Sequence, residues 1–302
     1  FFNSLTMSDS EKIEKLEEEI FNLEQLVIDD YSNKDIIKKF TKIQKRFMFY
    51  KKISPIEPLQ EYIQYFWILE DFANNSSNKC FKIIPDGVPA LIFQESPNMF
   101  FDKGGQALPQ LYIYGQSTKC IEHTVTGYFR VIGVYLQPTA LNTIFSLDAY
   151  ELNHQNVPLE YIVSESIQEQ LVNAVSVEEK IELISNFFFK QIQKVRNRDK
   201  RIEFTSKLLQ NGKALKDIQV EMNLSERSLE RMVKQSIGMS PKLFSRIMRF
   251  QSGLNYLRQA NFENLTELTY LSNYFDQSHY IREFKEFTGT NPKKFIQNAQ
   301  EH

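Results

Sequence analysis

The segment LSERSLERMVKQSIGMSPKLF, residues 224–244, recurs in altered form 51 residues later as FDQSHYIREFKEFTGTNPKKF, residues 275–295. Six of the 21 aligned positions are identical, and apolar residues match at others. The identical pairs are Arg231/Arg282, Lys234/Lys285, Gly238/Gly289, Pro241/Pro292, Lys242/Lys293 and Phe244/Phe295. A match of this length at a fixed offset indicates an internal duplication.

Both copies have the local signals of a helix-turn-helix unit. A helix is expected to begin after Ser225 in the first copy and after Asp276 in the second, because both residue types cap helix N-termini. Each helix should end at glycine, and the proline that follows suits the first turn of another helix. A short amphipathic segment ending in asparagine precedes each unit, at 214–223 and at 264–273. Asparagine tolerates the positive φ of a tight turn, so the order is helix, turn and capped second helix.

Polar side chains should occupy the outer face of each capped helix. In the first helix Leu229 and Val233 point inward, and in the second Tyr280, Phe284 and Phe287 form the apolar stripe. The outward residues are Arg227, Glu230, Arg231 and Lys234 in the first copy, and Gln277, Ser278, Arg282 and Lys285 in the second. Arginine, glutamine and glutamate are side chains that read base edges in DNA. The alternative is a solvated surface on which Glu230 merely pairs with Lys234.

The segment between the two units, residues 241–259, should form a rigid spacer helix with an apolar face. A rigid spacer matters because two reading helices on one side of DNA must lie about 34 Å apart. Lysines at the ends of both units are candidates for phosphate contacts. They are Lys234, Lys242, Lys285 and Lys293.

Between residues 53 and 137 the pattern changes to short strands rich in aromatic and β-branched residues, bounded by Pro, Gly and Asn. Several such strands without intervening helices predict a barrel or sandwich. A helix should follow at 138–147, and residues 157–195 again have a helical pattern. Six aromatic residues at alternating positions would line a ligand pocket if one exists, although core packing is the commoner role. They are Tyr65, Trp67, Phe93, Tyr112, Tyr114 and Tyr135.

The N-terminal residues 9–47 are predicted to be helical, with apolar residues at alternating spacings of three and four. The repeat covers about two heptads, which fits either a short coiled coil that joins two copies of the chain or a helix packed on its own domain.

Charge is unevenly distributed along the 302 residues, although the net charge is only −2. Residues 196–302 contain 18 Lys and Arg against 12 Asp and Glu, whereas residues 1–195 contain 18 against 26. A basic C-terminal third suggests a nucleic-acid reader. No apolar run approaches the length of a membrane span, and the two cysteines, Cys80 and Cys120, have no metal-like spacing and fit a reducing cytoplasm.

The segment from about 200 to 300 resembles the DNA-binding domain of the AraC/XylS family of bacterial transcription regulators. The resemblance rests on LSERSLERMVK, on GMSPK with RIMRFQSGL, and on FDQSHYIREFKEFTGTNPKKF. It implies two helix-turn-helix units joined by a central helix. It also implies that Arg227, Glu230, Arg231, Gln277, Ser278 and Arg282 occupy the base-reading positions.

Two features depart from the family pattern. Asn223 and Asn273 stand where the family usually has glycine, and Arg227 and Glu230 are not fixed by the family, so the target sequence stays open. Upstream, ISPIEPLQEYIQYFWILE, IIPDGVPALIF and the region 127–152 are similar to the β-rich N-terminal domain of some of these regulators. That similarity implies a sensing or dimerising role.

Two other classes of function are alternatives to this reading of the sequence. A cupin-like metal-dependent enzyme would need converging histidines, but only His123 and His154 lie in or beside the strand region, and no HxH pair or catalytic motif occurs. A pure interaction protein, such as an anti-regulator that never touches DNA, would not need the matched arginines.

The sequence therefore predicts an α+β chain with four parts. These are an N-terminal helical segment that is a candidate for dimerisation (1–47), a β-rich, barrel-like regulatory domain (48–158), a helical connector (159–198) and an all-α double helix-turn-helix domain (199–302). The expected protein is a cytoplasmic transcription factor, not an enzyme, with no metal or cofactor. Its expected partners are double-stranded DNA, a second copy of the chain, a small-molecule effector and, for an activator, RNA polymerase.

Overall fold

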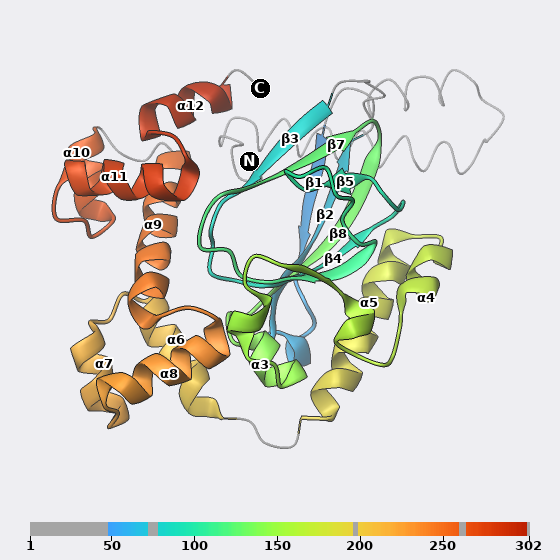
Figure 1. Ribbon diagram of the computed structural model, residues 1–302, viewed down its shortest axis with the longest axis horizontal. Coiled ribbons are helices and arrows are strands. Elements are labelled where there is room, and N and C mark those ends of the chain that lie inside the picture. Colours follow the sequence, from blue (N-terminus) through green and yellow to red (C-terminus); the bar gives the residue numbers. More distant parts are fainter. Residues whose placement is uncertain (1–47, 72–77, 196–198, 260–263, 301–302) are drawn as a thin grey trace.

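The computed structural model describes residues 48–71, 78–195, 199–259 and 264–300. Within these described ranges all the strands lie N-terminal to residue 159, and every regular element from residue 200 onward is a helix. Figure 1 shows the two parts side by side, with helix α9 along the edge of the β-rich part. The predicted α+β class, with a β-rich N-terminal part and an all-helical C-terminal part, is confirmed.

Two antiparallel sheets make up the β-rich part. The larger has six strands in the order β1-β2-β8-β4-β6-β9, and the smaller has the order β3-β7-β5. Their bounds are β1 Met48–Ile53, β2 Ile63–Asp71, β3 Asn78–Ile83, β4 Ala90–Gln94, β5 Phe100–Phe101, β6 Leu111–Tyr114, β7 Ile121–Thr126, β8 Phe129–Leu136 and β9 Asn156–Pro158. Strands β2, β8, β4 and β6 pair as direct antiparallel neighbours, which fixes which side chains share a face.

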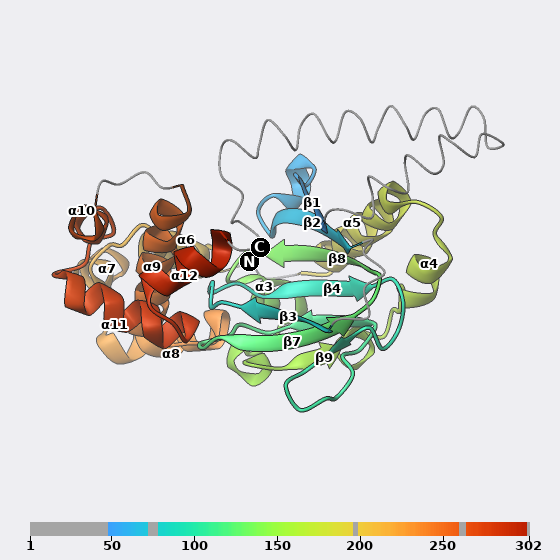
Figure 2. The same cartoon turned by 90° about the horizontal axis from the view of Figure 1, so that it is seen from above.

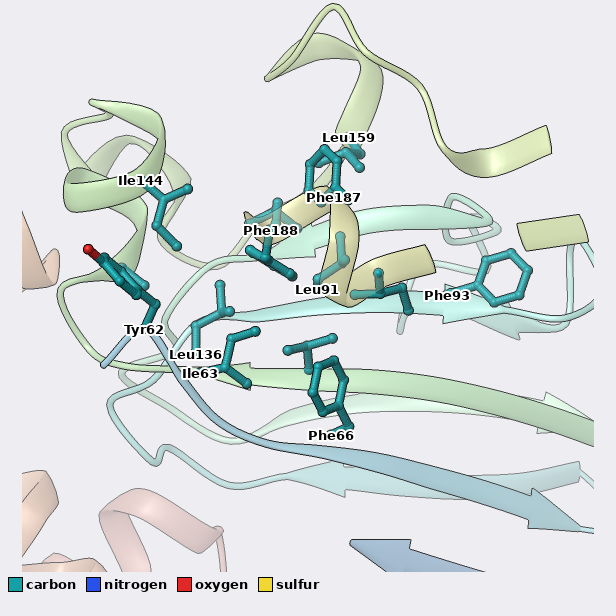
Figure 3. Packing of buried hydrophobic residues seen from close by; sticks show 14 of the residues in the cluster. Tyr62, Ile63, Phe66, Leu91, Phe93, Leu136, Ile144, Leu159, Phe187 and Phe188 are labelled. Carbon is teal, nitrogen blue, oxygen red and sulfur yellow. The ribbon is translucent and has the colours of Figure 1, made fainter. Parts of the chain in front are cut away.

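The central strands of the large sheet are buried on both faces, so their sequences are almost continuously apolar. In β2, Phe66 and Ile68 enter the core on one face, whereas Trp67 and Leu69 enter a second core on the other. In β4, Phe93 lies on the first face, with Leu91. Figure 3 shows this first core, into which Phe187 and Phe188 project from a covering helix.

Helices cover one face of the large sheet, and the small sheet covers the other. The helices are α3 Ala140–Phe145, α4 Gln168–Asn173 and α5 Val177–Gln193, with short 3-10 turns at Glu57–Leu59 (η1), Ala149–Leu152 (η2) and Leu159–Tyr161 (η3). On the second face Phe81, Phe100 and Phe129 from three strands stack edge to face. The two sheets thus enclose an aromatic interior.

The C-terminal part is a single cluster of seven helices around one apolar core. They are α6 Lys200–Gln210, α7 Leu215–Met222, α8 Glu226–Ile237, α9 Pro241–Gln259, α10 Leu265–Leu271, α11 Gln277–Thr288 and α12 Pro292–Gln300. The predicted caps are present: the Ser225 hydroxyl accepts from the Ser228 amide at 3.2 Å, and the Asp276 carboxylate accepts from the His279 amide at 2.7 Å.

The turns adopt the backbone conformations that the sequence predicts. Asn223 and Asn273 have φ of 51° and 56°, and Gly238 and Gly289 have φ of 90° and 74°. These residues end helices in the left-handed region, which asparagine and glycine tolerate best. Two helix-turn-helix units, α7–α8 and α10–α11, are thereby formed and joined by α9 (Figure 1).

Three strands were not predicted. β1 lies directly after the region expected to be helical, and its sequence MFYKKI does not alternate between apolar and polar residues. β5 has two residues, and β9 has three and ends in proline, so neither is long enough to show a period of two. The expected helix within 9–47, with its dimerisation role, lies outside the described residues. No helix that the structure describes is long and apolar enough to cross a membrane.

Gly133 allows the close packing of β8 against the only tryptophan. A Cβ at this position would fall within the Trp67 indole ring. We expect Gly133→Ala to lower the free energy of unfolding by about 1–3 kcal/mol, because one added methyl group in a full interior forces side chains from their places. Urea denaturation monitored by tryptophan fluorescence measures this. Gly104→Ala is the control, since its Cβ would meet only the Asp102 carboxylate, at 3.2 Å; equal losses for both variants would contradict the packing explanation.

Candidate nucleic-acid interface

Helix α8 presents its polar residues to solvent and buries its apolar ones. Leu229 and Val233 lie in the helical core, and Leu229 is 1% exposed. The four residues predicted on the outer face are all exposed: Arg227, Glu230, Arg231 and Lys234. Their spacing of three, four and seven places them along one side of the helix.

Helix α11 repeats this arrangement in the second unit. Tyr280, Phe284 and Phe287 are completely buried. Gln277, Ser278, Arg282 and Lys285 are exposed, and three of them, Ser278, Arg282 and Lys285, line one shallow hollow on the outer side of the helix. The predicted reading residues of each unit therefore share a solvent-facing surface.

The charged groups on these two surfaces are not neutralised by neighbours. Among the described residues no carboxylate lies within 4.0 Å of the guanidinium groups of Arg227, Arg231 or Arg282. Glu230 forms no ion pair with Lys234 there either. Instead, the Lys234 ammonium lies 5.6 Å from the centre of the Tyr150 ring, which belongs to η2. The pairing that would have explained the outer face of α8 as an ordinary solvated surface is absent from the described structure.

Two other arginines of the helical part, Arg246 and Arg249, hold α11 on α9. Glu283 is 3% exposed, accepts from the Arg246 Nε at 2.6 Å and from Arg249 at 3.1 Å, and lies 3.5 Å from the His279 ring. Burial alone would raise the pKa of the Glu283 carboxyl, but hydrogen bonds from Arg246 and Tyr274 and the charge of Arg249 hold it below its usual value. This cluster fixes the rotation of α11 about its own axis, and with it the direction of Arg282.

The two remaining lysine candidates stand at helix starts. Lys242 and Lys293 are exposed in the first turns of α9 and α12. Caps precede both helices: Ser240 accepts from the Leu243 amide at 3.2 Å, and Asn291 accepts from the Lys294 amide at 2.8 Å. A cation beside the amides of a helix N-terminus is a suitable arrangement for a phosphate group.

The first unit is bound directly to the β-rich part. The Asn153 side chain donates to the Gly238 carbonyl at 2.5 Å, and the Ser236 hydroxyl lies 3.4 Å from the Asn142 side chain. Gly238 combines this approach with a φ of 90°, so no other residue fits there without strain. α8 also contacts η2 and α3 of the β-rich part. Figure 2 shows the helical part to one side of the strands.

A cavity of about 350 Å³ lies within the β-rich part and is closed on one side by helical residues. Five of the six aromatic residues predicted to line a pocket border it: Tyr65, Trp67, Tyr112, Tyr114 and Tyr135. Phe93 does not. It projects from the opposite face of β4 into the first core (Figure 3), because alternate residues of a strand point to opposite faces.

Several residues that border this cavity were not predicted from the sequence. Asp86 borders it, and burial raises the pKa of its carboxyl to about 7 against the opposing effects of the Val88 amide and the Tyr135 hydroxyl. His123 also borders it, and burial lowers the pKa of the imidazole to about 4. Gln251 and Arg258 reach it from α9. No sequence signal links residue 258 to the strand region, since their neighbourhood exists only in the folded chain.

The second unit also carries an unpredicted residue at its outer edge. Phe275 is 88% exposed immediately before the N-cap of α11. The turn after Asn273 is one residue longer than the turn after Asn223, and Phe275 is the added residue. The sequence shows this extra residue: the two asparagines are 50 residues apart, whereas the N-cap residues of the two helices are 51 residues apart.

The structure brings no metal-ligand set together within the residues it describes. His123 is buried in the aromatic interior, whereas the His154 ring lies 3.0 Å from the Thr118 hydroxyl at the surface. The two histidines therefore do not converge on one site.

Two family models match separate parts of the chain. Residues 218–298 match a helix-turn-helix domain, which begins within α7 and extends through α12, and residues 51–158 match a domain of unknown function. No curated protein is significantly similar to the chain.

Solved structures with weaker likeness include ToxT from Vibrio cholerae, at 11% identity over 73% of this chain and 97% of that one, with a TM-score of 0.39. A ToxT structure with a bound unsaturated fatty acid covers 74% of this chain and 96% of that one at 14% identity, with a TM-score of 0.38. A probable AraC family regulator from Rhodopseudomonas palustris covers 33% and 98% at 17% identity, with a TM-score of 0.30.

Duplicated, exposed helices within a matched helix-turn-helix domain define the class: the chain is a DNA-binding transcriptional regulator. Its C-terminal domain is a helix-turn-helix domain, matched over residues 218–298.

The Glu283 cluster gives a test of how α11 is positioned. We expect Glu283→Gln to lower the free energy of unfolding by about 2 kcal/mol at pH 7, because a charged acceptor of several hydrogen bonds becomes neutral. Since the pKa of Glu283 is lower in the folded state, its contribution is complete above about pH 4.5, the usual value, and is lost as pH falls through the folded pKa. Denaturant unfolding across this pH range measures both effects.

Glu286→Gln is the matched control. Glu286 also accepts from Arg246 but is 51% exposed, so the expected loss is at most about 0.5 kcal/mol. Equal losses for the two variants, or an unchanged pH dependence in Glu283→Gln, would show that the cluster does not position α11.

Proposed function

We propose that the protein binds a specific DNA sequence by placing α8 and α11 in two adjacent major grooves on one side of the duplex. Arg227, Glu230 and Arg231 would read bases from α8, and Gln277, Ser278 and Arg282 from α11. The single observation that carries this is a matched pair of exposed arginines, Arg231 and Arg282, at equivalent positions of two capped helices, neither with a carboxylate partner among the described residues. Arginine binds guanine through two hydrogen bonds, which makes it the commonest base-specific side chain.

The length of α9 supports this geometry. Figure 1 shows α8 and α11 near opposite ends of α9. The 19 residues of α9 span about 28 Å at 1.5 Å per residue, comparable to the ~34 Å of one DNA turn. The four exposed lysines, Lys234, Lys242, Lys285 and Lys293, would contact phosphates and set the register of the protein on DNA.

The regulatory part is proposed to control this binding. The cavity in the β-rich part supports a small-molecule effector, since ligand sites are concave, largely apolar and of about this volume. We further propose that the protein acts in the cytoplasm as a homodimer joined through residues 1–47, and as an activator that contacts RNA polymerase. Its action is binding, with no catalytic step, cofactor or metal.

Arg231→Ala and Arg282→Ala test the reading role. Each variant should lose about 1–3 kcal/mol of affinity for the preferred sequence, identified by selection from a random DNA pool, and each should relax preference at its own base position. Affinity for random DNA should change much less. Repeated selection with each variant, together with mobility-shift titrations, measures both quantities.

Arg201→Ala is the control, because Arg201 is exposed on α6 and pairs with Asp199 at 2.8 Å. Equal losses on preferred and random DNA would remove Arg231 and Arg282 from the reading role. If no sequence is enriched by the unaltered protein, the proposed function itself is wrong.

Lys285→Gln tests the phosphate role. Affinity for preferred and random DNA should fall by the same factor, and the slope of log affinity against log salt should decrease by about 1, because one fewer counterion is released. Lys103→Gln, on the exposed surface of the β-rich part, should change neither quantity. A sequence-dependent loss in Lys285→Gln would instead assign this lysine to base reading.

A further inference from the structure

Phe275 lies in solvent at the N-terminal end of helix α11. Its side chain is 88% exposed, whereas four other phenylalanines of the helical part, Phe244, Phe250, Phe284 and Phe287, are completely buried. Single exposed apolar residues are common on protein surfaces, so exposure by itself assigns no role. The position of Phe275 in the second helix-turn-helix unit does assign one.

The turn before α11 leaves no place in the core for Phe275. In the first unit Leu224 follows the asparagine turn and packs, half-buried, against the helical core. In the second unit Tyr274 occupies the corresponding position: it is 4% exposed, and its ring centre lies 5.2 Å from that of Tyr280. Phe275 is the additional residue between Tyr274 and the N-cap, so its ring remains outside the core.

Phe275 is continuous with the reading surface proposed for α11. Four successive residues are exposed here: Phe275, the N-cap Asp276, Gln277 and Ser278. Two backbone steps of about 3.8 Å separate Phe275 from Gln277, so their Cα atoms lie at most about 7.6 Å apart. This distance corresponds to about two base-pair steps of ~3.4 Å. A duplex whose bases contact Gln277 therefore comes within reach of the Phe275 ring.

The chemistry of the Phe275 ring restricts what it can recognise on that duplex. The ring carries no charge and no hydrogen-bonding group, so it is unsuited to phosphates and to the polar edges of the bases. The N-terminal residues of a reading helix contact base edges in the major groove. In that groove thymine presents a C5 methyl group, which phenylalanine can recognise by apolar contact. Such a contact removes apolar surface of both partners from water.

From these observations we infer that Phe275 reads a thymine by packing against its C5 methyl group, within about three base pairs of the base that Gln277 contacts. The inference rests on the proposed function, because it extends the reading surface of α11 by one residue. It also makes the two units unequal. The first unit, whose turn is one residue shorter, has no counterpart of Phe275.

Replacement of thymine by deoxyuracil tests this contact, because it removes the C5 methyl group and keeps the base pair. The preferred duplex is identified by selection with the unaltered protein, and the base pair that Gln277 contacts by selection with Gln277→Ala. Each thymine within about three base pairs of it, on either strand, is then replaced singly. We expect one replacement to lower the affinity of the unaltered protein about fourfold in mobility-shift titrations, the effect of one buried methyl group.

Variants of Phe275 show whether this residue makes the contact. Phe275→Ala should bind the thymine and deoxyuracil duplexes equally and should retain the melting temperature of the unaltered protein, since the ring packs against no core. Phe275→Leu, which keeps an apolar side chain, should retain part of the preference for thymine. Phe189→Ala is the matched control, because Phe189 is 41% exposed on α5, which covers the large sheet. It should preserve the full preference for thymine.

Three results would overturn the inference. One is that no thymine near the base contacted by Gln277 depends on its methyl group, and another is that this dependence is unchanged in Phe275→Ala. The third is that Phe275→Ala loses the same affinity on both duplexes and keeps the preference for thymine, which would assign the ring to a different contact, such as insertion between base pairs.

The same measurements separate this inference from the proposed function. Enrichment of a DNA sequence by the unaltered protein, without a methyl effect that depends on Phe275, would overturn the reading of thymine alone. If the unaltered protein enriches no sequence, the proposed function fails, and the reading of thymine fails with it.

Discussion

The packing of α9 is the interaction on which the rest of the structure depends. Phe250 of α9 is completely buried and stacks on Phe284 and Phe287 of α11, with ring centres 5.6 Å and 5.1 Å apart. Earlier in the same helix, Phe244 and Met248 pack on Gly87 of the β-rich part. Because one helix contributes to all these contacts, it determines how α8 and α11 lie relative to each other and to the cavity. A well-packed interior adjusts little, so the spacing of the two units is held by side-chain volume.

The arginines of the helical part differ in role because they differ in the carboxylates within their reach. Arg246 and Arg249 reach the buried Glu283 and serve to orient α11. Arg231 and Arg282 have no carboxylate within reach in the described structure and remain exposed. An unpaired guanidinium in water costs little and can exchange its water for a base edge, whereas a paired one would first have to break its ion pair. All four arginines occur on amphipathic helices of similar composition. Paired and unpaired arginines can therefore be distinguished only by their neighbours in the folded structure.

Local signals predicted the helical part well, because capped helices, asparagine turns and glycine ends are determined within a few residues. The duplication strengthened each of these signals by showing it twice. The strand region was predicted in class but not in full: β1, β5 and β9 are too short or too irregular to show a period of two. Phe93 was misplaced because a strand buried on both faces has no polar side to reveal the direction of each residue. The sequence could not assign Arg258 to the cavity, since Tyr65 and Tyr135, which border the cavity with it, lie more than 100 residues away along the chain.

The two helix-turn-helix units are attached to the β-rich part in different ways, and in the proposed function this determines how a signal would travel. α8 is held directly, through Asn153 on Gly238 and through Tyr150 beneath Lys234. α11 is packed on α9, α10 and α12, so a change in the cavity would reach it through α9. If Lys234 contacts phosphate as proposed, its ammonium would turn away from Tyr150, so the DNA-bound and DNA-free arrangements would differ at this contact. An effector can shift the equilibrium between the DNA-bound and DNA-free arrangements only by the difference between its affinities for them. A ligand that contacts α9 would bind the two arrangements with different affinities if α9 moves between them.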